Sequence, residues 1–206
     1  MAVVIVDYDV GNLRSVQKAF EKVGAPARVS RRPEEILAAS AVALPGVGAF
    51  AECMGNLQKY GLVDVVKTFA ASGRPFLGIC VGYQILFDSS QEFGDCQGLG
   101  VFRGECVRFQ KTAGDHHKIP HMGWNQVIMS RPDPLFAGVP GGSDFYFVHS
   151  YYPKPAEDIT LTETEYGERF ASSVAKGRVY GVQFHPEKSQ KVGLMVLENF
   201  ARMAME

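Results

Sequence analysis

The chain has 206 residues, of which 46% are hydrophobic and 21% are charged, and this balance is ordinary for a folded globular domain. Its formal net charge of −1 gives no reason to expect nucleic acid or an anionic membrane as a partner. No apolar run approaches the roughly 20 residues that span a bilayer, and residues 1–7 lack the basic region and the small-residue cleavage site of a signal peptide, so we expect a cytoplasmic protein.

Strand and helix signals alternate along the first part of the chain. Short apolar runs predict strands at residues 2–7, 41–44 and 75–79. Helical spacing of apolar side chains, with proline or glycine near the ends, predicts helices at 13–23, at 33–39, through the fifties and sixties, and at 82–88. This alternation is typical of a parallel sheet with helices on both faces.

The pattern changes after about residue 98. Runs of β-branched and aromatic residues, separated by glycine, proline and aspartate, predict strands at 101–109, 144–148, 159–164, 170–174 and 179–184. An amphipathic helix is predicted at 191–203. The sequence has no visible linker, repeat or low-complexity tract, so we interpret residues 1–206 as one α/β domain whose second half extends the same sheet.

One of the four cysteines, Cys80, lies between glycines directly after an apolar run. The segment Gly78-Ile79-Cys80-Val81-Gly82, between a predicted strand and a predicted helix, is the cysteine form of a nucleophile elbow. A strand that turns sharply into a helix holds its nucleophile in a strained conformation, and the glycines permit the close approach. By itself the motif fits a glycine-rich turn with a structural cysteine equally well, because short glycine motifs match by chance.

A second signal is the segment Gly181-Val182-Gln183-Phe184-His185-Pro186-Glu187. In an extended chain, residues i and i+2 project to the same side, so His185 and Glu187 can lie together. A carboxylate beside an imidazole selects the tautomer and stabilises the imidazolium. Alone, such a pair is more often a surface histidine before a turn, but with Cys80 it supplies the nucleophile, base and orienting acid of thiol catalysis.

The third signal is the glycine loop Pro45-Gly46-Val47-Gly48 at the end of a predicted strand. In elbow enzymes one N–H that holds the oxyanion belongs to the residue after the nucleophile, here Val81. A second N–H comes from a strand-end loop of this kind, where we expect Val47 to supply it. Without the other two signals, the loop would be interpreted as an ordinary turn between a strand and a helix.

These motifs resemble the class I, triad-type glutamine amidotransferases. G-x-C-x-G-x-Q and H-P-E are shared across that family, and longer strings resemble one branch of it, the glutaminase subunits of imidazole glycerol phosphate synthase. Those strings are DYDVGNLRSV at 7–16, PGVGAF at 45–50, PHMGWN at 120–125 and GVQFHPEKS at 181–189. Asp9 departs from the glycine that is more common there, but aspartate tolerates left-handed geometry better than most residues, so we expect the turn to survive.

The resemblance implies a flavodoxin-like, three-layer α/β/α fold with a mostly parallel central sheet. It also implies that Cys80 attacks the side-chain amide of L-glutamine, that ammonia leaves, and that water hydrolyses the thioester to glutamate. His185 would move the protons and Glu187 would orient it. Neither a metal nor a cofactor is implied. The residues that the resemblance assigns to the glutamine pocket are Gly48, Gln84, Glu92, Ser150 and Tyr151.

Nothing in the sequence suggests a site that would use the ammonia, because it has no phosphate loop and no second domain. The resemblance implies a heterodimer with a (β/α)8-barrel cyclase subunit. That subunit would make imidazole glycerol phosphate and an aminoimidazole carboxamide ribotide in histidine biosynthesis. The residues implied at the partner interface are Asn12, Met122, Trp124, Asn125 and Lys188.

Other interpretations are weaker. His116, His117 and His121 could suggest a metal site, but no cysteine or carboxylate pair stands near at ligand spacing and Pro120 would interrupt a helix, so we expect a polar loop. The PHMGWN and DYDVGNL strings disfavour a glutaminase that feeds a purine or vitamin B6 synthase. Gln84 and the glycine loop disfavour a cysteine peptidase or another hydrolase, and the intact triad disfavours a non-catalytic subunit.

Overall fold

The first half of the chain folds into alternating strands and helices. The computed structural model describes residues 3–110 and 117–205. The strands are β1 (Val3–Val6), β2 (Ala27–Ser30), β3 (Ala41–Gly46) and β4 (Phe76–Cys80). The helices are α1 (Leu13–Lys22), α2 (Pro33–Leu37), α3 (Phe50–Lys59), α4 (Val63–Ala70) and α5 (Val81–Gln84). The apolar strands β1 and β3 are buried along their length, as expected for parallel strands covered on both faces.

The second half is rich in strands. They are β5 (Ser89–Ser90), β6 (Cys96–Gln97), β7 (Gly104–Arg108), β8 (His121–Met129), β9 (Ser143–His149), β10 (Tyr151–Pro155), β11 (Thr160–Tyr166), β12 (Glu168–Lys176) and β13 (Val179–Val182). Two short 3-10 helices, η1 (Pro134–Phe136) and η2 (Pro186–Lys188), precede the final helix α6 (Gln190–Met203). None of the helices in the described ranges is long and apolar enough to cross a membrane.

The described residues form two sheets. The larger has nine strands in the order β2-β1-β3-β4-β13-β12-β11-β8-β9, with parallel pairing from β2 to β13 and antiparallel pairing from β13 to β9. The smaller has the order β10-β7-β5-β6. The prediction that the second half extends one sheet is therefore wrong for residues 101–109. These residues form β7, which pairs with β10 in the smaller sheet. β10 directly follows β9, because the chain leaves the large sheet at Ser150.

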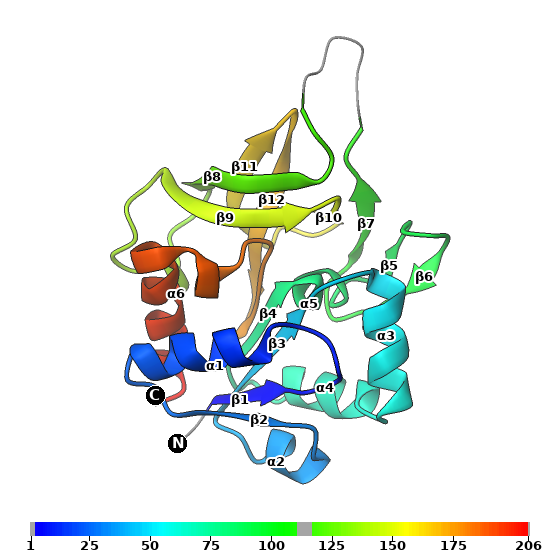
Figure 1. Ribbon diagram of the computed structural model, residues 1–206, viewed down its shortest axis with the longest axis vertical. Helices are drawn as coiled ribbons and strands as arrows, with labels where there is room; N and C mark the ends of the chain where they lie inside the picture. The colour runs from blue at the N-terminus through cyan, green and yellow to red at the C-terminus, as the bar shows by residue number, and fades with distance from the viewer. Residues whose placement is uncertain (1–2, 111–116, 206) are drawn as a thin grey trace.

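Helices cover both faces of the parallel strands (Figure 1). The order β2-β1-β3 means that the chain moves one way from β1 to β2 and the other way from β2 to β3. Because such crossovers are right-handed, α1 and α2 lie on opposite faces. α6 packs against α1, and α4 packs against α2, so the sheet lies between two helical layers. The predicted flavodoxin-like α/β/α fold is confirmed.

Two predicted helices differ from the structure for identifiable reasons. The helical region through the fifties and sixties is two helices, α3 and α4, because Gly61 adopts a φ of +65° between them. The helix predicted at 82–88 is the single turn α5. The carbonyls of Ile85, Leu86 and Phe87 accept hydrogen bonds from the N–H groups of residues 99–101, and these bonds end the helix. Strands β2, β8 and β10 had no clear sequence signal.

Candidate active site

Cys80 lies at the sharp turn from β4 into α5. Its backbone has a φ of +56°, a left-handed conformation that costs a non-glycine residue ~1–3 kcal/mol. The turn closes against β3, in which Gly46 is the register partner of Cys80. A Cβ atom added to Gly82 would lie 1.8 Å from the carbonyl oxygen of Leu44, and one added to Gly78 would lie 2.7 Å from that of Gly82. Gly82 is therefore required by the close packing of α5 against β3, and Gly78 by the close packing of α5 against β4.

His185 and Glu187 lie together just after β13. His185 Nδ1 is 2.8 Å from Glu187 Oε1, and both side chains are almost fully buried. Because the carboxylate can only accept, Nδ1 carries a hydrogen, and the ring presents Nε2 as an acceptor whenever it is neutral. Nε2 is buried and has no hydrogen-bond partner among the residues described. Burial opposes a charge on the ring, but interactions with the Cys80 sulfur and the Glu187 carboxylate outweigh it and raise the pKa of His185.

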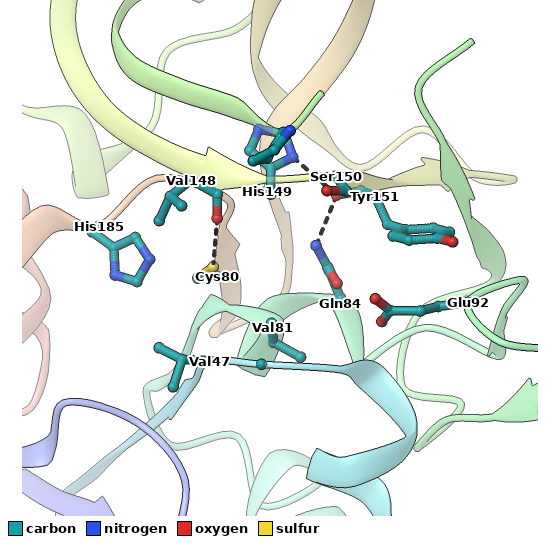
Figure 2. A pocket seen from close by; sticks show the side chains of 12 residues that line it. Val47, Cys80, Val81, Gln84, Glu92, Val148, His149, Ser150, Tyr151 and His185 are labelled. Carbon is teal, nitrogen blue, oxygen red and sulfur yellow. Dashed lines mark hydrogen bonds between the residues drawn. The ribbon is translucent and has the colours of Figure 1, made fainter. Parts of the chain in front are cut away.

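Cys80 and His185 face the same cavity of about 280 Å³ at the carboxyl ends of β3 and β4 (Figure 2). The residues predicted for the nucleophile, the base, the oxyanion and the glutamine pocket all line it. They are Val47, Gly48, Cys80, Val81, Gln84, Glu92, Ser150, Tyr151 and His185. Glu187 contacts the cavity only through the imidazole that it orients. Pro120, Val148 and His149 also line the cavity and were not predicted.

Gln84 and Glu92 lie at the end of the cavity opposite the imidazole (Figure 2). Gln84 Nε2 donates to the carbonyl oxygen of Tyr151 at 2.8 Å and to Gln183 Oε1 at 3.1 Å, which leaves its own amide oxygen for a ligand. Glu92 Oε2 accepts from the backbone N–H of Phe50 at 2.7 Å, at the start of α3. One carboxylate oxygen thus stabilises the helix start, and the carboxylate gives this end of the cavity an acceptor for a donor group.

The predicted oxyanion donors lie on two adjacent backbone segments. Val81 is the first residue of α5, so its N–H has no partner within the helix and can donate to a ligand. Val47 and Gly48 form the loop after β3, in which Gly48 has a φ of +88°. The carbonyl oxygen of Val47 accepts from Cys53 Sγ at 3.6 Å, so this oxygen faces α3. Val47, Gly48 and Val81 all line the cavity, so the loop after β3 and the start of α5 form one of its walls.

The family described as glutamine amidotransferase class-I matches residues 4–204. The chain belongs to this family. The imidazole glycerol phosphate synthase subunit HisH of Moorella thermoacetica is 54% identical over 98% of this chain and 94% of the relative. The subunit of the same name from Syntrophotalea carbinolica is 50% identical over 98% and 100%. A solved glutamine amidotransferase has a TM-score of 0.76 at 20% identity, with all of both chains covered, and therefore shares the fold.

In this amidotransferase, β8 carries exposed apolar side chains. Met122 is 61% exposed and Trp124 is 49% exposed. The Trp124 ring meets the Tyr146 ring edge-on at 6.1 Å, and Lys188 Nζ lies 5.7 Å from the centre of the same Tyr146 ring. Trp124 and Lys188 therefore lie on one surface, where both contact the ring of Tyr146. Tyr146 was not among the residues predicted from the sequence. Asn12 is exposed and caps the start of α1 with its side chain.

For the histidine cluster of this amidotransferase, His116, His117 and His121, the sequence predicted a polar loop. This prediction is wrong for His121, and His116 lies outside the described residues. His121 is buried at the start of β8, with Nδ1 3.0 Å from His149 Nε2 and with Asn125 Nδ2 3.2 Å from its own Nε2. His149 Nδ1 donates to the carbonyl oxygen of Tyr151 at 2.9 Å. Burial lowers the pKa of His121 to about 4 and that of His149 to about 3, so both are neutral at pH 7. Across residues 3–110 and 117–205, no group of three His, Cys, Asp or Glu side chains could hold a metal ion.

Two neighbours of the nucleophile were not predicted from the sequence. Gln183 Nε2 lies 3.8 Å from Cys80 Sγ, and the carbonyl oxygen of Val148 lies 3.9 Å from the same sulfur (the Val148 contact is drawn in Figure 2). A signal for Gln183 was available, since the alternation that pairs His185 with Glu187 also puts Gln183 on the same side. Val148 contributes only its backbone, for which a pattern of side chains gives no signal.

Proposed function

We propose that this chain is the glutaminase subunit of an imidazole glycerol phosphate synthase and hydrolyses L-glutamine through a thioester on Cys80. The observation that carries the proposal is that Cys80, at a strained elbow, shares one small cavity with His185, which Glu187 orients. Membership of the amidotransferase family supports glutamine as the substrate. Identity of about 50% to HisH subunits supports this particular synthase. In this proposal residues 1–206 act as one glutaminase domain that needs no cofactor.

Thioester formation begins when the thiol proton of Cys80 passes to His185 Nε2. The sulfur attacks the side-chain amide carbon of glutamine, and the carbonyl oxygen becomes an oxyanion that accepts from the N–H groups of Val47 and Val81. The imidazolium, stabilised by Glu187, gives its proton to the amide nitrogen. The C–N bond then breaks and ammonia leaves.

Hydrolysis of the thioester uses the same groups in the same order. A water molecule gives a proton to His185 Nε2 while its oxygen attacks the thioester carbon. The second oxyanion collapses, the C–S bond breaks, the sulfur recovers the proton, and glutamate is released. The amino-acid end of the substrate would lie opposite the imidazole, where the Glu92 carboxylate can pair with the α-ammonium group. The other residues of this pocket would be Gly48, Gln84, Ser150 and Tyr151.

We further propose that the ammonia passes to a (β/α)8-barrel cyclase subunit in a cytoplasmic heterodimer. The relatives are named as subunits of a synthase, which supports a partner subunit. The exposed Met122 and Trp124 on β8, with Lys188 nearby, support this face as the docking surface, because large apolar side chains often anchor partners. Asn12 and Asn125 would be further contacts.

The test is Cys80→Ala, assayed in the assembled complex with the cyclase. We expect no product from glutamine but product from ammonium salts at raised pH, where more NH3 is present. In the wild-type complex, an electrophilic glutamine analogue should label Cys80 and spare Cys53, Cys96 and Cys106. Labelling at one of those three cysteines would contradict the nucleophile. Loss of the ammonium-dependent reaction in a properly assembled complex would contradict the division of labour between subunits.

A further inference from the structure

A fully buried amide contacts the nucleophile. Gln183 follows β13 directly and has no exposed surface. Its backbone N–H donates to the carbonyl oxygen of Ser172 at 2.8 Å, which fixes the chain at this residue. Its side-chain Nε2 lies 3.8 Å from Cys80 Sγ. A buried polar group at this position is costly unless all of its hydrogen bonds are made, so the direction of the amide matters.

The neighbouring Gln84 determines that direction. Gln84 donates to the backbone carbonyl of Tyr151, which can only accept, and this identifies the amide nitrogen of Gln84. The second hydrogen on the same nitrogen faces the side chain of Gln183 at 3.1 Å. The atom of Gln183 that meets this donor is therefore its oxygen. The amide nitrogen of Gln183 must then face Cys80, and a flipped amide would set two donors against each other.

The sulfur of Cys80 thus lies between one acceptor and one uncharged donor. The carbonyl oxygen of Val148, at 3.9 Å, can accept from the thiol but repels a thiolate. The amide N–H of Gln183 can donate to the sulfur in either state and donates more strongly when the sulfur is negative. His185 lines the same cavity and receives the proton, but in doing so it changes its own charge.

We propose that Gln183 is a catalytic residue of the glutaminase reaction whose amide N–H stabilises the sulfur anion of Cys80. This assignment rests on the proposed function, because it requires Cys80 to be the nucleophile. The donor acts twice, first when the thiol loses its proton and again when the C–S bond breaks and the sulfur leaves with the electron pair. Hydrogen bonds to charged groups are the strong ones in proteins, so removing this donor should lower kcat by ~10- to 100-fold.

Two variants of Gln183 separate the donor from the rest of the side chain. Gln183→Glu keeps the shape and the oxygen that Gln84 donates to, but it replaces the donor with a second oxygen. Gln183→Met keeps the length and removes both polar atoms. The matched control is Asn199→Leu, which removes another buried amide. Asn199 lies on α6 and donates to the carbonyl oxygens of Leu135 and Ala137, away from Cys80.

The decisive measurement is the rate of Cys80 alkylation by iodoacetamide as a function of pH, read by mass spectrometry, because only the thiolate reacts. We expect the pH of half-maximal alkylation to rise in both Gln183 variants, and more in Gln183→Glu, where a negative charge adjoins the sulfur. With glutamine and the cyclase present, kcat should fall while KM changes little. Asn199→Leu should lower Tm without moving the alkylation profile.

The results that would overturn the proposal are distinct from those that concern the function itself. If wild-type Cys80 resists the electrophilic glutamine analogue, the proposed function fails. If wild type is labelled but Gln183→Glu has the wild-type alkylation profile and kcat, only the role of Gln183 is refuted. Should Gln183→Met fold poorly, Gln183→Glu alone decides, because it retains the partner of Gln84.

Discussion

Replacing Gly82 by alanine should damage both folding and catalysis, because α5 and β3 approach each other too closely for a side chain. The added Cβ would lie 1.8 Å from the carbonyl oxygen of Leu44 and 2.8 Å from its carbonyl carbon. Contacts under 3.0 Å are essentially never seen, so the backbone must move by at least 1.2 Å, the difference between 3.0 and 1.8 Å. Leu44 is fully buried in a strand with parallel neighbours on both sides, so it cannot move alone.

We expect Gly82→Ala to cost about 3 kcal/mol or more, at the upper end for overpacking, since the contact is with backbone. For a chain of this size that corresponds to a fall in Tm of ~6–12 °C. The same shift would move Cys80, two residues away, by about 1 Å against its base. A displacement of this size can cost ~10²-fold in rate.

Gly55→Ala is the matched control for Gly82→Ala. Gly55 lies inside α3 with no atom within 4 Å of the added Cβ, so the change should stabilise the protein by ~0.5–1 kcal/mol without affecting activity. The assays are thermal unfolding and glutamate release in the complex. A Gly82→Ala variant with the Tm and kcat of the wild type would refute the packing argument.

Two further predictions concern the buried carboxylate of Glu187 and the buried imidazole of His149. Glu187→Gln keeps the shape beside His185 but removes the carboxylate, so kcat for glutamate release should fall by ~10²-fold or more with Tm little changed, and an unchanged kcat would show the carboxylate to be structural. Because the pKa of His149 is lowered to about 3, the unfolded chain binds more protons than the folded one below pH 6.5, and stability falls as the pH falls. Between pH 7.5 and 5.0 this histidine should account for about 2 kcal/mol of that loss. In urea unfolding, His149→Gln should therefore have a pH dependence smaller by that amount; an equal dependence in both proteins would mean that His149 is not held neutral.

The elbow at Cys80 could be predicted because its backbone geometry is local and requires particular residue types at consecutive positions. A strand, a turn with glycines on both sides of a cysteine, and a helix are consecutive in the chain, and the packing of Gly78 and Gly82 explains the motif. The proximity of His185 and Glu187 is equally local, since it follows from an i, i+2 relation. Family resemblance supplied the pocket residues, which then converged on the cavity.

Features that depend on distant pairing were not predictable. β8 contains Gly123 and Asn125 and becomes a strand because it pairs with β9, and β10 forms only where β7 lies beside it. The neutral state of His121 likewise depends on its burial, to which the rings of Phe147 and Tyr166, distant in the chain, contribute. A short segment of sequence does not identify the distant residues that will pack or pair with it.

The sheet order also dictates when, during synthesis on the ribosome, the cysteine can become reactive. β4 ends in Cys80, yet the strand that flanks it on one side is β13, and Gln183 follows the cysteine by 103 residues. A nascent chain therefore carries the thiol through most of translation without the base, the carboxylate or the amide that surround it in the fold. The surroundings of the nucleophile are therefore complete only when the late strand β13 docks beside β4.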